Sequence, residues 1–130
     1  GDDLKYGFEP EISLHSITQH TNHELVAIHH PSKTLLEADL MFNLPAKEQF
    51  SRSKEPFLFR ATGLSKFLHP GNAAHDKAVS GTLTKGAQLQ KELKPLLDAD
   101  IDRIIPCHGD VIETGGKSVF EDVFRKYMGA

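Results

Sequence analysis

The spacing of apolar residues changes near the middle of this chain of 130 residues, and that change limits the fold more than any other feature. Over the first 42 residues, apolar and polar residues alternate in short runs, which is typical of strands with one buried face. The three runs read ISLHSI, ELVAIHH and TLLEADLMF, at residues 12–17, 24–30 and 34–42. The tripeptide PSK separates the last two, so these predict an antiparallel pair joined by a short turn.

From residue 57 onward the spacing becomes three or four residues, which predicts helices. Helices are expected over residues 57–68 and 73–80, in the stretch after Thr84, and over residues 117–128. We expect Thr84 to cap the third helix and Pro95 to end or bend it near Lys94, because proline lacks the N–H that an inner turn needs. A short buried strand, DRIIP at residues 102–106, precedes the last helix. This order of strands and helices predicts an α+β layered domain.

Length and composition indicate a single globular domain over residues 1–130. The formal net charge is −3 and there is no basic block, so nucleic acid is not expected as a partner. No apolar run approaches the roughly 18 residues of a membrane-spanning helix, and no signal peptide is visible, so no membrane partner is expected either. The one cysteine, Cys107, excludes an internal disulfide and favours a reducing, cytoplasmic setting.

Three polar residues stand near the ends of the predicted strands. His20 lies in the polar break TQHTNH, Asp39 lies near the end of the third strand, and His108 follows RIIP in the segment PCHGD. A carboxylate next to large apolar residues is costly unless it is paired or coordinated. Side chains from several strand ends can gather at one rim of a sheet, where imidazole and carboxylate suit Zn²⁺, Mn²⁺ or Fe²⁺. We therefore expect Asp39 and His108 to meet, with His20 as a third candidate ligand.

Each of these residues also has a purely structural interpretation. Asp39 could cap the loop after its strand, and PCHGD could be a turn in which Gly109 takes a positive φ and His108 is incidental. Glu37 shares a strand face with Asp39, and we expect Glu37 to be the exposed carboxylate of the two. Several other histidines are expected to be packing, surface or loop residues: His15, His29, His30, His69 and His75.

Two segments, taken together and in order, resemble the second half of the metallo-β-lactamase fold. QHTNHELVAIHHPSKTLLEADLMF resembles the superfamily block in which a histidine after a strand precedes two strands and a metal-bridging aspartate. RIIPCHGDVI resembles the late PGHG strand end, whose histidine is a metal ligand. The PSKTL turn is similar to one in a fungal and bacterial group of that superfamily. The resemblance covers most of the chain.

This resemblance implies a fold, a metal site and an activity. The fold would be half of an αββα sandwich, in which a mostly antiparallel sheet is covered by helices on one face. His20 and His108 would be terminal ligands to two metal ions, Zn²⁺ or alternatively Mn²⁺ or Fe²⁺. Asp39 would bridge the two ions, and Asp39 and His108 would be the catalytic residues. An activated water would attack an ester, amide or thioester carbonyl of a small-molecule substrate.

The chain also departs from the superfamily pattern. The main ligand string, His-x-His-x-Asp-His, belongs to the first half of the fold and occurs nowhere in residues 1–130. Ala38, Cys107 and Gln19 stand where glycines usually precede the three ligand positions. One copy of this chain therefore cannot complete a dinuclear site. Cys107 is not expected to be a nucleophile, since His108 next to it on a strand is poorly placed as its base.

Half a sandwich would leave one face of its sheet bare. At about 25 cal/mol per Å² of apolar surface, such a face is a strong reason for a partner. We expect either a homodimer that packs sheet against sheet about a two-fold axis, or a separate amino-terminal half that supplies the missing layer. Two functions follow: a metal-dependent hydrolase or its remnant, or a non-catalytic binding protein on the same scaffold.

Overall fold

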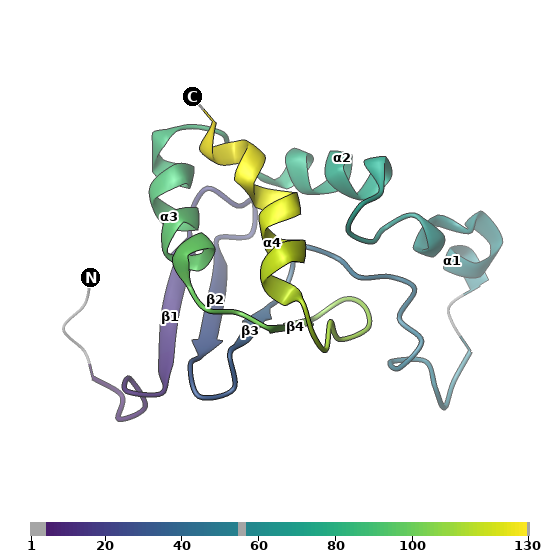
Figure 1. Cartoon of the computed structure of the whole chain (residues 1–130). Helices are drawn as coiled ribbons and strands as arrows, with labels where there is room; N and C mark the ends of the chain where they lie inside the picture. Colours follow the sequence, from purple (N-terminus) through teal and green to yellow (C-terminus); the bar gives the residue numbers. More distant parts are fainter. Residues whose placement is uncertain (1–4, 55–56, 130) are drawn as a thin grey trace.

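The computed structural model describes residues 5–54 and 57–129, which form one four-stranded sheet and a layer of helices on one side of it (Figure 1). The strands are β1 (Ile12–Ile17), β2 (Glu24–His29), β3 (Thr34–Glu37) and β4 (Arg103–Pro106), in that order across the sheet. β1, β2 and β3 are antiparallel neighbours, whereas β4 pairs with β3 in parallel. The predicted α+β class is confirmed, and the complete sandwich stays a prediction.

The first three strands form where the alternation predicts them, but β3 is shorter than expected. It ends at Glu37 rather than at residue 42. The next four backbone N–H groups, those of residues 38–41, donate to the carboxylates of Glu24 and Glu37 instead of to a neighbouring strand. These side-chain acceptors replace the strand ladder, so the chain turns away from the sheet.

The helices are α1 (Phe57–Thr62), α2 (Ala73–Thr82), α3 (Ala87–Asp98) and α4 (Gly116–Phe124), with 3-10 turns η1 (Leu64–Lys66) and η2 (Arg125–Met128). The predicted helix over residues 57–68 is divided at Gly63, whose φ of +64° lies outside the helical region. None of the helices in the described part of the chain is long and apolar enough to cross a membrane.

The predicted cap of α3 at Thr84 is wrong, and so is the predicted end of the helix at Pro95, whereas the alternative that Pro95 bends the helix stays a prediction. The helix begins after Gly86 with no side-chain cap, while the Thr84 N–H donates to the Gln19 carbonyl. α3 also continues through Pro95 to its end three residues later. Because proline has no N–H, Pro95 cannot donate a hydrogen bond to the Lys91 carbonyl. Both residues are exposed, so water can donate to that carbonyl instead.

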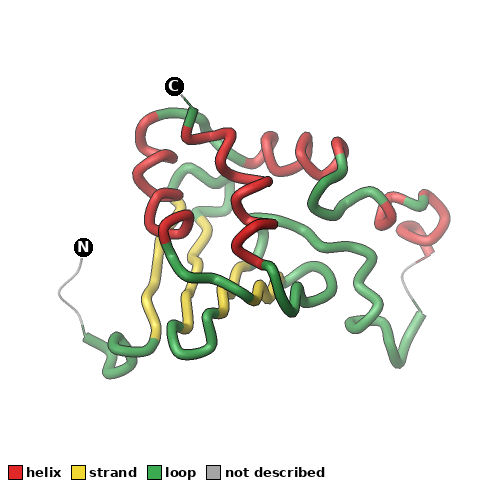
Figure 2. The backbone as a smooth tube through the Cα atoms, in the orientation of Figure 1, coloured by secondary structure: helices red, strands yellow, loops and turns green. Residues whose placement is uncertain are grey.

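The hydrophobic core lies between one face of the sheet and the helix layer. α3 and α4 cross this face (Figures 1 and 2) and bury their apolar sides against it. Strand and helix residues join in one buried cluster that includes Val26, Ile28, Leu35, Ile104, Leu89, Leu93, Leu96, Phe120, Val123 and Phe124. We call the face of the sheet that lies against α3 and α4 the covered face.

The opposite face of the sheet, which we call the open face, carries apolar side chains that none of the helices in the described residues covers. Leu14, Ala27, Leu36 and Ile105 are paired neighbours across all four strands, so their side chains form one row. Leu14 is 44% exposed, Leu36 40% and Ile105 36%. Leu25, two residues from Ala27 on the same strand, adds another exposed side chain to this face.

Candidate functional site

The parallel pairing of β3 and β4 brings the two predicted catalytic residues to the same rim. Glu37, the last residue of β3, pairs with Pro106, the last residue of β4. Asp39 and His108 each follow two residues later, so both leave the sheet at its carboxyl edge. His108 Nε2 lies 3.0 Å from Asp39 Oδ1. The predicted contact between these two residues is confirmed.

The second oxygen of Asp39 is also held. Asn22 Nδ2 donates to Asp39 Oδ2 at 2.6 Å, from the turn between β1 and β2. Glu24 fixes the backbone beneath it, because its carboxylate accepts from the N–H groups of Ala38 at 2.6 Å and Asp39 at 3.2 Å. The Asp39 carboxylate is therefore oriented by a side chain and by its own backbone, and its side chain stays 30% exposed.

The segment after β4 holds His108 in place through its backbone. Its carbonyl accepts from the Asn43 N–H at 3.1 Å, and its ring lies 6.1 Å from the Phe42 ring, centroid to centroid. Gly109 has a φ of +129°, and a Cβ there would lie 2.2 Å from the Asn43 carbonyl oxygen. The turn thus requires glycine, as its structural interpretation predicts, and it also presents a half-exposed imidazole.

His20 is buried in the turn between β1 and β2, at 2% exposure. Its Nδ1 accepts the Asn22 N–H at 3.2 Å, which leaves the ring proton on Nε2 when the imidazole is neutral. Within the described residues, that Nε2 has no hydrogen-bond partner. Asn22 therefore touches both His20, through its backbone, and Asp39, through its side chain.

Asp39 and His108 form a pair rather than a complete metal centre. Across residues 5–54 and 57–129 there is no group of three or more His, Cys, Asp or Glu side chains that could hold one metal ion. An oriented carboxylate and an exposed imidazole are nevertheless donors that Zn²⁺ accepts. The chain supplies at least two such donors at one rim. His20 is linked to Asp39 through Asn22, which hydrogen-bonds to both residues.

Glu37 is buried, contrary to the prediction that it is the exposed carboxylate. It is 7% exposed on the covered face, and burial raises its pKa to about 9 despite hydrogen bonds from the backbone N–H groups of Met41 and Leu40. These bonds, at 3.2 Å and 2.8 Å, both reach Oε2, so Glu37 holds the start of the segment after Asp39. Leu35 and Glu37 alternate on one side of β3, and that alternation could have revealed its burial.

His75 is a second buried polar residue that the sequence interpretation missed. It lies on α2 rather than in a loop, at 0% exposure, and its Nε2 accepts the Phe42 N–H at 3.2 Å. Burial lowers the pKa of His75, so the neutral ring that this hydrogen bond needs is favoured. Phe42 thus lies between His75 and His108, and α2 is tied to the segment that follows Asp39.

No protein-family model, curated protein or solved structure matches this chain.

Proposed function

We propose that this chain forms the carboxyl-terminal half of a metal-dependent hydrolase of the metallo-β-lactamase type, acting on an ester, amide or thioester. One observation carries the proposal: Asp39 and His108, distant in sequence, lie in contact at the carboxyl ends of two parallel strands. Both side chains remain accessible to solvent at that rim. A carboxylate and an imidazole so placed have the chemistry of metal ligands.

The residues at the rim fit the donor set of such a metal, although they do not complete it. Asp39 and His108 would hold the ion, and Asn22 would orient the carboxylate as an outer hydrogen-bond partner. His20, with a buried Nε2 that lacks a partner among the described residues, is the third candidate. A bound Zn²⁺ would supply Lewis acidity and lower the pKa of a water molecule.

The remaining donors would come from another segment, and we propose that this segment packs on the open face. The row of Leu14, Leu36 and Ile105 is apolar and about 40% exposed, as expected of a surface that normally lies against a second layer. An amino-terminal half seated there would lie next to the rim that carries Asp39 and His108. Its ligands and those of this chain would then share one site.

Zinc titration of the purified protein tests the proposal. We expect Asp39→Ala and His108→Ala each to weaken Zn²⁺ binding by about tenfold or more, measured by isothermal titration calorimetry in a non-coordinating buffer. Asp98→Ala and His30→Ala are matched controls, since both residues are exposed and away from the rim, and they should bind as the unmodified chain does. Equal affinity in all five proteins, or no zinc binding at all, would contradict the metal site.

The open face also favours a second candidate function, a non-catalytic binding protein that acts as a homodimer. Two copies packed sheet against sheet would cover the same apolar row without an amino-terminal half. Sedimentation should then show a dimer at micromolar concentration, and Leu36→Lys should dissociate it whereas Gln88→Lys on the exposed side of α3 should not. A monomer at all concentrations tested would exclude the homodimer.

A further inference from the structure

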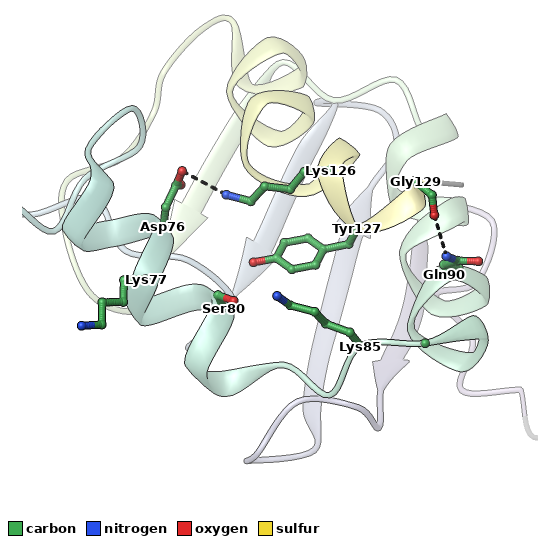
Figure 3. Close-up of a pocket in the computed structure, with 9 residues that line it drawn as sticks. Asp76, Lys77, Ser80, Lys85, Gln90, Lys126, Tyr127 and Gly129 are labelled. Atoms are coloured by element: carbon green, nitrogen blue, oxygen red, sulfur yellow. Dashed lines mark hydrogen bonds and ion pairs between the residues drawn. The ribbon is translucent and has the colours of Figure 1, made fainter.

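A hollow of about 570 Å³ lies between α2, the start of α3 and η2, and it contains none of the residues discussed above as metal ligands (Figure 3). Three lysines and one aspartate line it, so the charge of its walls is mainly positive. The lining residues include Asp76, Lys77, Ser80, Lys85, Gln90 and Lys126. Gln90 closes one side, where its Nε2 donates to the Gly129 carbonyl at 3.3 Å.

Tyr127 crosses this hollow and has an unused hydroxyl group. The residue is 9% exposed, and within the described residues its hydroxyl has no hydrogen-bond partner. Figure 3 shows the hydroxyl end directed toward α2, between the side chains of Lys85 and Lys126. A buried hydroxyl is normally paired, so this group is available to donate a hydrogen bond to a ligand in the hollow.

Two ammonium groups flank the same ring. Lys85 Nζ lies 5.8 Å from the Tyr127 ring centroid and Lys126 Nζ lies 5.6 Å from it. Lys126 also pairs with Asp76 at 3.0 Å, whereas Lys85 pairs with no carboxylate in the described part of the chain. Lys77 points away from the centre of the hollow (Figure 3). Lys85 is therefore the cation with unmatched charge beside the orphan hydroxyl.

The start of α3 adds further positive potential. α3 has twelve residues and begins after Gly86, which has no side chain to cap its first N–H groups. Uncapped N–H groups at a helix amino terminus carry partial positive charge and bind anions through the backbone. Gly86 and Gln90 line the hollow, so the start of α3 lies at its wall. A Cβ at Gly86 would meet no atom within 4 Å, which leaves open space at this end of the helix.

We propose that this hollow binds the phosphate group of a small phosphomonoester. Lys85 and the start of α3 supply positive charge, and the Tyr127 hydroxyl donates a hydrogen bond to a phosphate oxygen. The hollow is several times larger than one phosphate group, so it has room for the organic part of the ligand. Flexible lysine side chains over the ring can move apart as the ligand enters.

The negative charge of Asp76 disfavours phosphate binding, so removing that charge should increase the affinity. The Asp76 carboxylate is the one negative side chain among the lining residues, and it neutralises Lys126. Removing that charge leaves Lys126 available to the ligand. Asp76→Asn should therefore strengthen phosphate binding, whereas loss of Lys85 should weaken it.

The experiment is a titration with inorganic phosphate at constant ionic strength, followed by two-dimensional NMR of the whole chain. We expect the amide signals at the start of α3 to shift. Lys85→Gln and Tyr127→Phe should each raise the dissociation constant by about tenfold, and Asp76→Asn should lower it. Lys94→Gln is the matched control, since this exposed lysine of α3 lies outside the hollow.

Tyr127→Phe also separates binding from folding. Because the hydroxyl has no partner among the described residues, its removal should leave the thermal midpoint without phosphate unchanged or raise it. Phosphate should raise the midpoint of the unmodified chain more than that of this variant. Equal dissociation constants for Lys85→Gln, Lys94→Gln and the unmodified chain, or no saturable shift near α3, would overturn the proposal.

Discussion

The two faces of the sheet are built from the same strands and contain similar residue types, yet they are buried to very different extents. On the covered face, Leu35 and Ile104 are fully buried against α3 and α4. On the open face, their neighbours Leu36 and Ile105 are 40% and 36% exposed. Strand alternation places apolar residues on both faces, which is typical of a sheet that lies between two layers.

This difference shows that sequence hydrophobicity and burial can be separated within a single strand. Adjacent leucines of β3 have the same volume and the same strand propensity, but only Leu35 contacts the helix layer. The side chain of its neighbour Leu36 points to the open face and is 40% exposed. Substitutions of these two leucines therefore measure separately how much the helix layer stabilises the sheet and how much a partner on the open face would stabilise it.

The largest expected effect is the difference between two alanine substitutions in β3. Leu35→Ala should lower the free energy of unfolding by about 2–5 kcal/mol, because it leaves a cavity under α3 and α4. Leu36→Ala should change it by less than about 1 kcal/mol in the monomer, because a large part of that side chain is already exposed to water. Urea unfolding followed by circular dichroism measures both.

The same pair reports on a partner at the open face. If two copies cover that face, Leu36→Ala should become more destabilising as protein concentration rises, whereas the effect of Leu35→Ala on each protomer's core should persist at every concentration. Equal costs for the two substitutions at low concentration would mean that the two faces do not differ as the structure describes.

The next effect concerns Glu37, the carboxyl group on the covered face. Its pKa is raised to about 9 by burial from an ordinary value of 4.5. Below pH 4.5 it is protonated in both the folded and unfolded chains; between pH 4.5 and 9 the unfolded chain alone loses the proton. Stability should therefore fall as pH rises through this window, and Glu37→Gln, which cannot ionise, should be more stable by about 2 kcal/mol at pH 7.

This gain should disappear below pH 4.5 and increase toward pH 9, as measured by urea unfolding in the presence of EDTA. Glu24→Gln is the matched control, since it also removes a buried carboxylate beside β3. Glu24 accepts two backbone N–H bonds, and losing its charge should destabilise the chain by about 1–2 kcal/mol. A Glu37→Gln variant that is less stable at every pH from 5 to 9 would show that Glu37 ionises in the fold.

Local periodicity predicts much of this fold but not where its elements end. The alternation in residues 12–17 and 24–30 matches β1 and β2, and the carboxyl-terminal apolar stripe matches α4. The end of β3 depends on Glu24, fourteen residues before the N–H group of Ala38 that it accepts. Such a side-chain acceptor competes with the strand ladder through a contact that periodicity does not encode.

Part of the candidate site can also be predicted from the sequence, and part of it cannot. The contact between Asp39 and His108 is predictable because both follow strand ends, and parallel neighbours end at one rim. His75 falls within the helix predicted over residues 73–80, but that helical spacing does not show that its ring is fully buried and accepts the Phe42 N–H. The hollow around Tyr127 has no such signal, because its lining residues come from three separate segments with no shared spacing.

The smallest expected effect lies in the helix layer that separates the two faces. α3 turns Leu89, Leu93 and Leu96 toward the covered face, whereas Pro95 lies on its exposed side. Pro95→Ala should restore a backbone hydrogen bond to the Lys91 carbonyl and raise the free energy of unfolding by about 1 kcal/mol. Part of the gain is offset because alanine leaves the unfolded chain more flexible than proline does.

Thermal and urea unfolding of Pro95→Ala measure this gain, with Lys91→Ala as a control that keeps the proline and should change stability by less than about 0.5 kcal/mol. Pro95→Ala should add to Leu36→Ala without coupling, since the two residues lie on opposite sides of the covered face. A coupling energy above about 0.5 kcal/mol would mean that the stability contributions of the open face and the helix layer depend on each other.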